Sequence, residues 1–210
     1  MRILIATGIY PPDIGGPATY SKELADELIR QGHTVVVITY GGKKELGLVT
    51  VSRQLPKVIR HFIYFLKVLR NAIHADIIYA QDPVSVGLPA SFAAWFLRKK
   101  FVVRIAGDYA WEQGVGRFGV KELLDDFLKL RYGFRVELLR WCQQLVARSA
   151  DLVIVPSEYL KEVVLRWGLK NKNIEVVFSV AQRVGKISKE DARASLGLDG
   201  KVFVSAGRVV

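Results

Sequence analysis

The sequence predicts an α/β protein with a Rossmann-like, doubly wound parallel sheet. Short apolar runs rich in β-branched residues alternate with amphipathic stretches of helical length, and most of these runs are apolar throughout. Continuous apolar runs are typical of parallel strands that helices cover on both faces. The 210 residues are enough for one such domain with a proper core and few for two.

The order of the elements follows from this alternation. We expect strands at residues 2–7, 33–40, 48–52, 76–80, 101–106, 152–155 and 174–178. We expect helices at residues 18–31, 56–73, 84–97 and 157–167, and helical segments from 121 to 149. Gly32 suits the left-handed position that ends the first helix, and Ser157 suits the N-cap of the last. A glycine-rich loop is expected at residues 107–119, between the strand at 101–106 and the helical segments that begin at 121.

The tail departs from this pattern. Residues 188–196 are typical of a short helix, and residues 201–206 of a fully apolar strand. A parallel strand without a covering helix is poorly buried, so we expect it to open a second domain. The predicted organisation is an N-terminal domain at 1–185, a linker with a short helix at 186–198, and the start of a truncated second domain at 199–210.

Composition narrows the class of protein. A formal charge of +11 and a pI near 9.8 favour a polyanionic partner such as nucleic acid, anionic lipid or a phosphorylated ligand. Cys142 is the only cysteine, which excludes an internal disulfide and a thiolate metal site. The three histidines have no metal-ligand spacing, so we predict neither a metal site nor a cofactor. No signal peptide is recognisable, and the longest uncharged stretch, 83–97, is too short to span a bilayer, so a cytoplasmic protein is expected.

Parallel sheets bind ligands at the carboxyl ends of their strands. We therefore expect the site in the loops that follow Thr7, Ala80, Ala106 and Val155. The first of these loops contains Gly15 and Gly16 just before the first predicted helix. A helix start with glycine offers free N–H groups and close backbone approach to a phosphate, but paired glycines also occur in tight turns. Position alone leaves both interpretations open, and neither the G-x-G-x-x-G fingerprint nor a P-loop is present.

Four segments together resemble glycosyltransferase family 4 of the GT-B superfamily. They are the opening strand with Tyr10-Pro11-Pro12 and Gly15-Gly16, ADLVIVPS followed by YLK at 150–161, RASLGL at 193–198, and FVSAGR at 203–208. The resemblance covers nearly the whole chain. It implies the N-terminal, acceptor-side half of a protein in which two Rossmann-like domains face each other, and in which the second domain supplies most of the donor site.

The resemblance also implies roles for individual residues. Gly15 and Gly16 match the loop that faces the donor diphosphate, and Arg208 matches the arginine that neutralises it. Asp108, in the segment RIAGDYAWE at 104–112, falls where many members carry a histidine beside the transferred sugar, which makes it the predicted catalytic residue. The predicted substrate-binding residues are Asp82, Tyr109, Trp111, Glu112 and Ser157.

Structural alternatives stay open for most of these residues. Asp108 can cap the turn after Gly107, and Ser157 can cap a helix without touching a ligand. Trp111 and Glu112 can be loop packing and a solvated acid. Asp82, which precedes Pro83, is typical of a turn at a strand end.

The basic charge is concentrated in one segment. Residues 46–75 contain no acid, and the predicted helix at 56–73 has a wide apolar face with bases mainly on its other side. Such a helix is typical of attachment to an anionic membrane surface, or of a packed helix with a solvated basic face. The bases that we assign to a membrane surface are Arg53, Lys57, Arg60, Lys67 and Arg70.

These observations lead to one expected function and two alternatives. The resemblance implies transfer of a sugar from a nucleotide diphosphate sugar to a saccharide or lipid-linked acceptor, with retention of configuration and without a metal ion, in polysaccharide or glycolipid synthesis. The fragment alone is expected to be nearly inactive and, if membrane-bound, peripheral on the inner face. The alternatives are a sugar-nucleotide epimerase of similar shape and a non-catalytic membrane-binding module. No nucleic-acid motif is recognisable, so no nucleic-acid partner is expected.

Overall fold

The computed structural model of the chain describes residues 1–41, 46–169, 173–179 and 187–203. The chain divides into two compact units, Met1–Phe178 and Ser179–Val210. The first unit holds the whole sheet and seven of the described helices, and the second holds one short helix.

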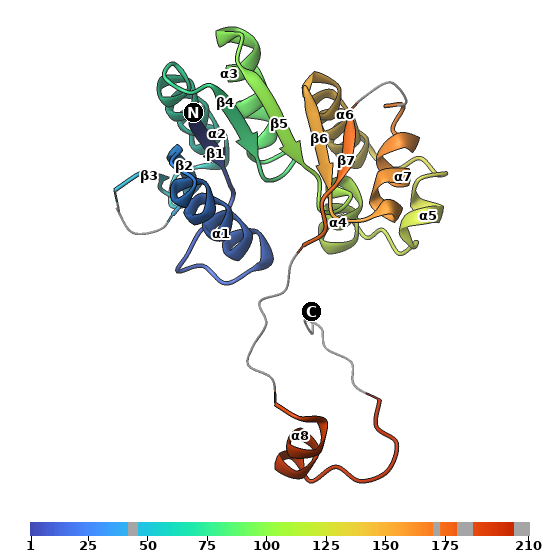
Figure 1. Ribbon diagram of the computed structural model, residues 1–210. Coiled ribbons are helices and arrows are strands. Elements are labelled where there is room, and N and C mark those ends of the chain that lie inside the picture. Colours follow the sequence, from blue (N-terminus) through green and yellow to red (C-terminus); the bar gives the residue numbers. More distant parts are fainter. Residues whose placement is uncertain (42–45, 170–172, 180–186, 204–210) are drawn as a thin grey trace. The chain divides into compact units, whose positions relative to one another are not determined.

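The first unit is built on a single parallel sheet of seven strands (Figure 1). The strand order is β3-β2-β1-β4-β5-β6-β7, so the winding direction reverses between β1 and β4. The strands are β1 (Arg2–Ala6), β2 (Thr34–Tyr40), β3 (Leu48–Val51), β4 (Ile77–Ala80), β5 (Lys100–Arg104), β6 (Leu152–Val155) and β7 (Ile174–Val176). This confirms the predicted fold class, and each of the seven strands expected from 2 to 178 is present. Open sheets of this kind bind ligands at the point of reversal.

Helices cover the two faces of the sheet unequally (Figure 1). The helix α1 packs on the face that carries Ile3, Ile5 and Tyr79, whereas α2, α3, α6 and α7 pack on the larger core around Leu4 and Ile78. The helices are α1 (Gly16–Arg30), α2 (Lys57–Ala72), α3 (Gly87–Leu97), α4 (Tyr109–Arg117), α5 (Leu124–Phe127), α6 (Phe134–Ser149) and α7 (Glu158–Arg166). Alternate residues of each strand point to opposite faces, which is why neighbours in one strand belong to different cores.

Two helical predictions were wrong in detail. Residues 109–117 form α4 rather than a glycine-rich loop, because the side chain of Asp108 accepts a hydrogen bond from the Trp111 N–H and caps a helix there. The helical segments expected from 121 to 149 are the two helices α5 and α6, with Gly133 at the N-cap of α6. The third helix also begins at Gly87 rather than at residue 84.

The second unit contains α8 (Lys189–Leu196), close to the helix expected at 188–196. The Ser188 hydroxyl accepts a hydrogen bond from the Asp191 N–H at its start, and Gly197 has the left-handed φ of 61° that often ends a helix. Residues 201–203 form no strand, and the rest of the strand expected at 201–206 lies outside the described residues.

Close backbone packing at the start of α3 gives a test of the fold. A Cβ atom added to Gly87 would lie 2.3 Å from the Asp82 carbonyl oxygen. Relieving this contact requires the backbone itself to move, which costs free energy. We expect Gly87→Ala to lower the free energy of unfolding by about 1–3 kcal/mol, the usual cost of overpacking. Urea denaturation measures this. Gly116→Ala is the matched control in α4, where no atom lies within 4 Å of the added Cβ, and it is expected to be neutral or stabilising by up to about 1 kcal/mol. Equal stability of the two variants would contradict the packing argument.

Candidate functional site

A polar pocket of about 490 Å³ lies at the carboxyl ends of β1, β2, β4 and β5, where the winding reverses. The first segment of its wall comes from Gly8 and Ile9, which follow β1, and the last from α4. The polar and charged side chains on the wall are Tyr40, Lys57, Arg60, His61, Gln81, Asp82, Ser85, Tyr109, Glu112 and Arg117. Its size is within the range of small-ligand sites.

Asp82 stands at the start of the segment that leads into α3. One carboxylate oxygen accepts hydrogen bonds from the N–H groups of Val84 and Ser85, at 2.8 and 2.6 Å, and the other accepts from the Ser85 hydroxyl at 2.6 Å. Burial raises the pKa of this carboxyl group, and these hydrogen bonds oppose the rise. Asp82 therefore forms the turn that was the structural alternative, and it also lies on the pocket wall.

The start of α4 supplies two further polar groups. Burial, then the charge of Asp82, raises the pKa of Tyr109 to about 12, so its hydroxyl stays protonated and can donate. The Glu112 carboxylate is tucked against Gly107, where an added Cβ would lie 2.1 Å from its Oε1 atom. Desolvation, together with the nearby carboxylates of Asp108 and Asp82, raises the pKa of Glu112. A carboxyl group with a raised pKa that faces a pocket is a candidate for contact with a substrate hydroxyl.

Tyr40 and His61 form a polar pair on the opposite wall. The Tyr40 hydroxyl lies 2.7 Å from His61 Nδ1 and donates to the Ser85 carbonyl at 3.1 Å. Since the hydroxyl has only one hydrogen, this arrangement makes His61 Nδ1 the donor of the pair. Burial, and then the positive charge of Arg60, lowers the pKa of His61. The imidazole is therefore favoured in its neutral form, with Nε2 as an acceptor.

Gln81 is the feature of the pocket that the sequence did not reveal. Its side chain is 4% exposed, and neither its amide oxygen nor its amide nitrogen has a hydrogen-bond partner in the described part of the chain. The Nε atom of Arg60 is likewise buried there without a partner. By contrast, the buried Gln143 accepts from the Ala110 N–H and donates to Asp108. A buried amide without partners costs free energy, and a polar ligand in the pocket would satisfy it.

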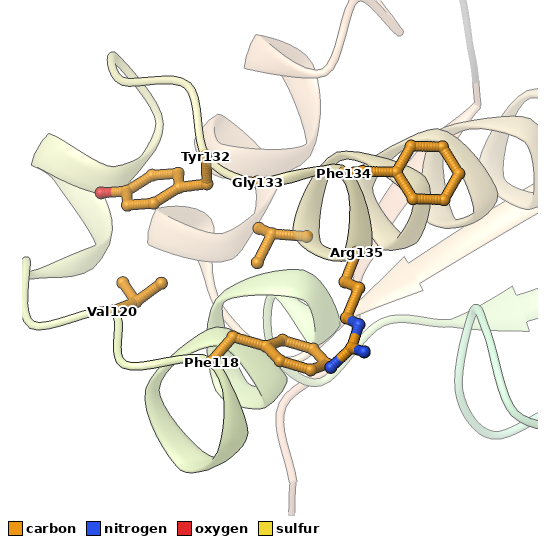
Figure 2. A pocket seen from close by; sticks show the side chains of 7 residues that line it. Phe118, Val120, Tyr132, Gly133, Phe134 and Arg135 are labelled. Atoms are coloured by element: carbon orange, nitrogen blue, oxygen red, sulfur yellow. The ribbon is translucent and has the colours of Figure 1, made fainter.

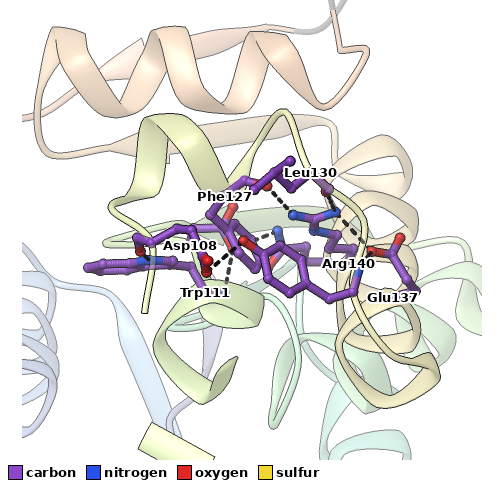
Figure 3. A network of polar contacts seen from close by, with 9 residues as sticks. Asp108, Trp111, Phe127, Leu130, Glu137 and Arg140 are labelled. Carbon is purple, nitrogen blue, oxygen red and sulfur yellow. Dashed lines mark hydrogen bonds and ion pairs between the residues drawn. The ribbon is translucent and has the colours of Figure 1, made fainter. Parts of the chain in front are cut away.

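Asp108 lies beneath the pocket wall, within the polar network that Figure 3 shows. Its side chain is 1% exposed, and it accepts hydrogen bonds from the Trp111 N–H at 2.9 Å, the Gln143 amide at 3.1 Å and the Trp167 indole at 3.2 Å. Burial raises the pKa of this carboxyl group, and the three hydrogen bonds oppose the rise. The structure supports the capping alternative for Asp108, and direct contact with the reacting sugar stays a prediction.

Arg140 extends the same network on α6 (Figure 3). Its guanidinium donates to the carbonyls of Phe127 and Leu130 and to Glu137, and lies 3.9 Å from the centre of the Phe127 ring. These contacts join α5 to α6 and hold the support on which α4 packs.

The structure brings only some of the predicted site residues together. Asp82, Tyr109 and Glu112 line the pocket. The Trp111 indole instead donates to the Glu122 carbonyl, and the Ser157 hydroxyl accepts from the Leu160 N–H as a helix cap. Gly15 and Gly16 form the start of α1, whose Pro17 touches the pocket. Arg208 lies outside the described residues.

The predicted membrane bases point in several directions. Arg53 pairs with Asp13, Lys67 donates to the Thr50 carbonyl, and Lys57 and Arg60 line the pocket. Arg70 is exposed near the end of α2. Arg53, Lys57 and Arg70 are exposed, and the assignment of the five bases to a membrane surface stays a prediction.

The apolar side of α2 differs from that picture as well. Its buried residues are Tyr64, Val68 and Ala72, whereas Val58, Phe62 and Leu66 form an exposed stripe at a spacing of four residues. Ile63, Phe65 and Leu69 also pack against the core, so α2 has apolar residues on its buried side and on its exposed side. Exposed apolar patches of this kind mark interaction surfaces.

A second hollow, of about 380 Å³, lies between the end of α4 and the start of α6 (Figure 2). Phe118, Val120 and Tyr132 line it, and Arg135 lies over the Phe118 ring at 5.9 Å. None of the predicted site residues lines this hollow. Among the described residues, no cluster of three or more histidine, cysteine or acidic side chains is placed to hold a metal, and no helix is long and apolar enough to cross a membrane.

Comparison with known proteins gives both a family and a fold. The family model described as Glycosyltransferase Family 4 matches residues 14–179. Alpha-monoglucosyldiacylglycerol synthase of Streptococcus pneumoniae (strain ATCC BAA-255 / R6) is 25% identical in an alignment 234 residues long. The alignment covers 100% of this chain and 49% of that protein. The chain therefore spans about half the length of this relative.

Two solved structures share the fold at low identity. Sucrose-phosphate synthase of Thermosynechococcus elongatus is 17% identical with a TM-score of 0.60, covering 94% of this chain and 53% of the other. UDP-GlcNAc 2-epimerase of Methanocaldococcus jannaschii is 14% identical with a TM-score of 0.55, covering 84% of this chain and 45% of the other. Because a synthase and an epimerase match almost equally well, these likenesses show the fold alone.

The Asp108 network gives a stability prediction. Asp108→Ala removes the cap of α4 and leaves the Gln143 and Trp167 donors without this acceptor. A lost cap costs about 1 kcal/mol, and an unsatisfied buried donor about 1–3 kcal/mol. We expect the variant to be less stable by about 2–4 kcal/mol in urea denaturation.

Asp126→Ala serves as the control for this variant. Asp126 pairs with Lys129 at the surface, with both side chains more than half exposed, so its loss should change stability by less than about 0.5 kcal/mol. If Asp108→Ala were as mild as this control, the carboxyl group would not hold α4 in place.

Proposed function

The chain belongs to glycosyltransferase family 4, and we propose that the full-length protein transfers a sugar from a nucleotide diphosphate sugar to a lipid-linked acceptor. We propose that the reaction retains anomeric configuration, needs no metal ion and takes place at the cytoplasmic surface of a membrane, in glycolipid or polysaccharide synthesis. The acceptor side of the reaction is assigned to the pocket at the end of β1 and β4.

The single observation that carries this proposal is Gln81. A hydroxyl-bearing ligand can accept from the amide nitrogen and donate to the amide oxygen, which satisfies both unpartnered atoms at once. Asp82 and Glu112 offer carboxylate acceptors to the same ligand, and Tyr109 offers a donor. This mixture of donors and acceptors around a pocket suits a sugar or another polyol headgroup better than an apolar ligand.

The bases of the pocket add a preference for negative charge. Lys57, Arg60 and Arg117 lie on its wall together with two acids. We assign these cations to a phosphate, either of the donor or of an anionic acceptor. The start of α1 at Gly15 and Gly16 is the proposed contact for the donor diphosphate, and Arg208 is its proposed partner from the second domain.

Asp108 acts in this proposal as a positioning residue. It fixes the start of α4, and the next turn of that helix carries Tyr109 and Glu112 into the pocket. Preorganised polar groups stabilise developing charge without moving during the reaction, so their support matters to catalysis. Trp111 and Ser157, which were predicted to touch substrate, hold neighbouring segments in the same way.

A lipid-linked acceptor is favoured by two independent facts. The relative from Streptococcus pneumoniae is named as a synthase of a glucosyldiacylglycerol. The exposed stripe on α2 gives the domain an apolar surface next to a basic pocket wall, a combination suited to an anionic bilayer. A soluble saccharide acceptor has no hydrocarbon chain that could bind to that apolar surface.

Gln81→Leu is the sharpest test of the acceptor site. Leucine removes both unpartnered polar atoms, so we expect unchanged or raised stability. It also removes two hydrogen bonds to the acceptor, so kcat/KM for transfer should fall by at least about tenfold, or ~1.4 kcal/mol. The measurement uses the full-length protein with radiolabelled uridine and guanosine diphosphate sugars and a membrane lipid extract.

The control for this test is Gln143→Leu, which removes the amide that is already satisfied. It should lower stability, the opposite of the expected effect at Gln81. Native transfer by Gln81→Leu would remove this residue from the site. An acceptor-independent change in the sugar nucleotide would favour an epimerase instead.

Membrane attachment is tested on α2. We expect the full-length protein to sediment with anionic vesicles at low salt and less with rising salt, because surface charge is screened within ~8 Å at physiological ionic strength. Replacing the exposed apolar residues Val58, Ile59 and Leu66 of α2 together with serine should weaken binding by more than about tenfold, since each buried apolar side chain contributes up to ~1.5–3 kcal/mol.

Ile29→Ser on α1 is the matched control, because Ile29 is about as exposed but lies on the other side of the sheet. It should bind vesicles like the unmodified protein. The membrane proposal would be contradicted if the unmodified protein did not bind anionic vesicles. It would also be contradicted if the triple variant bound them fully.

A further inference from the structure

An apolar groove of about 390 Å³ lies between α2 and α3, which pack against each other on the same face of the sheet. One wall consists of Phe62 and Phe65 from α2. The other consists of Leu88, Pro89, Phe92, Trp95 and Phe96 from α3. His61 is the one lining residue with a polar side chain, so the groove has almost nothing to offer a polar ligand.

The helix α3 is built so that this groove stays open and apolar. Its small residues Ala90, Ala93 and Ala94 face the core, while Trp95 and Phe96 are 77% and 67% exposed. The helix contains no charged residue from Gly87 to Leu97. Large aromatic side chains left in water beside a concave apolar surface indicate an occupant that shields them.

The groove and the polar pocket adjoin at His61. This side chain lines both, and its Nδ1 atom is held by the Tyr40 hydroxyl at the boundary. On the polar side of His61 lie Lys57 and Arg60, and on the apolar side lie only hydrocarbon and aromatic surfaces. A ligand that fills both spaces is an amphiphile with a hydrocarbon chain and a polar or anionic head.

We propose that the groove holds one hydrocarbon chain of the acceptor while the head of the same molecule enters the pocket beside Gln81. The inference rests on the proposed function and names the substrate class of that site. It assigns α3 and Phe62 a part in recognising the acceptor, whereas Val58 and Leu66 of the stripe on α2 contact the bilayer surface. His61 marks the boundary at which the chain ends and the head begins.

The groove differs from a general membrane contact in a way that can be measured. A bilayer surface needs assembled lipid, whereas a chain site binds a single dissolved amphiphile with a fixed stoichiometry. Trp95 lies on the groove wall and reports on contact, because bromine on an alkyl chain quenches indole fluorescence at close range. The probe is 12-bromododecanoate, kept well below the concentration at which it forms micelles.

We expect the full-length protein to show saturable quenching by this probe with a stoichiometry of one. Trp95→Phe should abolish the quenching, while Trp141→Phe, which removes an exposed indole on α6 outside the groove, should leave it intact. Phe92→Gln puts a polar group on the groove wall and should raise the Kd at least about tenfold. Ile29→Gln is its surface control on α1, and bromoacetate, which has no chain, should not quench.

Three results would overturn the chain site. Quenching by brominated vesicles but not by the monomeric probe would reduce the groove to a bilayer contact. Quenching that survives Trp95→Phe would place the chain elsewhere. A concentration-dependent dimer that Phe92→Gln dissociates, with no probe binding, would make this face a contact between two copies of the chain.

The chain site and the proposed function can fail separately. Probe binding needs no donor and no turnover, so an intact quenching profile with no sugar transfer to any lipid would contradict the function and leave an amphiphile site. Transfer to long-chain and short-chain acceptors with equal kcat/KM, and with no effect of Phe92→Gln, would uphold the function and contradict the groove.

Discussion

The carboxyl group of Asp108 joins three helices beneath the candidate site. It receives a backbone N–H from α4, an amide from α6 and the indole that follows α7, all within 3.2 Å. A buried carboxylate is stable only where such donors surround it, so the four groups depend on one another. The arrangement fixes the first turn of α4, and with it the direction in which Tyr109 and Glu112 project. The position of this part of the pocket wall therefore depends on the hydrogen bonds of Asp108.

A second constraint comes from the parallel sheet. Every strand delivers its following loop to the same edge, and the reversal between β1 and β4 separates the helices that would otherwise close that edge. Gln81 lies at this point, one residue after β4, with an amide that the protein itself does not satisfy. The contrast with Gln143, which is also buried and has a partner at each amide atom, shows that the fold can satisfy an amide where no ligand is needed. Such locally unfavourable groups are typical of functional sites.

The sequence predicted the fold better than the site, and the reason is physical. Apolar runs and helical periodicity report directly on burial, so all seven strands from Arg2 to Val176 were located within a few residues. The helix α4 was missed because its stability comes from a cap and from packing on Val120 and Phe127, not from its own glycine-containing sequence. Asp82, Tyr109 and Glu112 were found from strand ends and from a family resemblance. Gln81 carries no sequence signal at all, since an unpartnered amide is visible only when its surroundings are known.

The basic residues of the proposed acceptor side lie in two different settings. The excess of bases suggested electrostatic attachment, yet Arg53 pairs with Asp13 and Lys67 bonds to a backbone carbonyl, so both have local roles. Lys57 and Arg60 instead line the pocket, where Arg60 is half-buried and Lys57 is exposed. The cations of the pocket wall would attract an anionic head group, and the apolar surface outside the pocket would contact a hydrocarbon chain of the same ligand. An acceptor with an anionic head and a hydrocarbon chain meets both conditions, whereas a free sugar or a plain lipid meets only one. In this proposal the groove between α2 and α3 makes the distinction, because it would bind a hydrocarbon chain attached to the head group in the pocket.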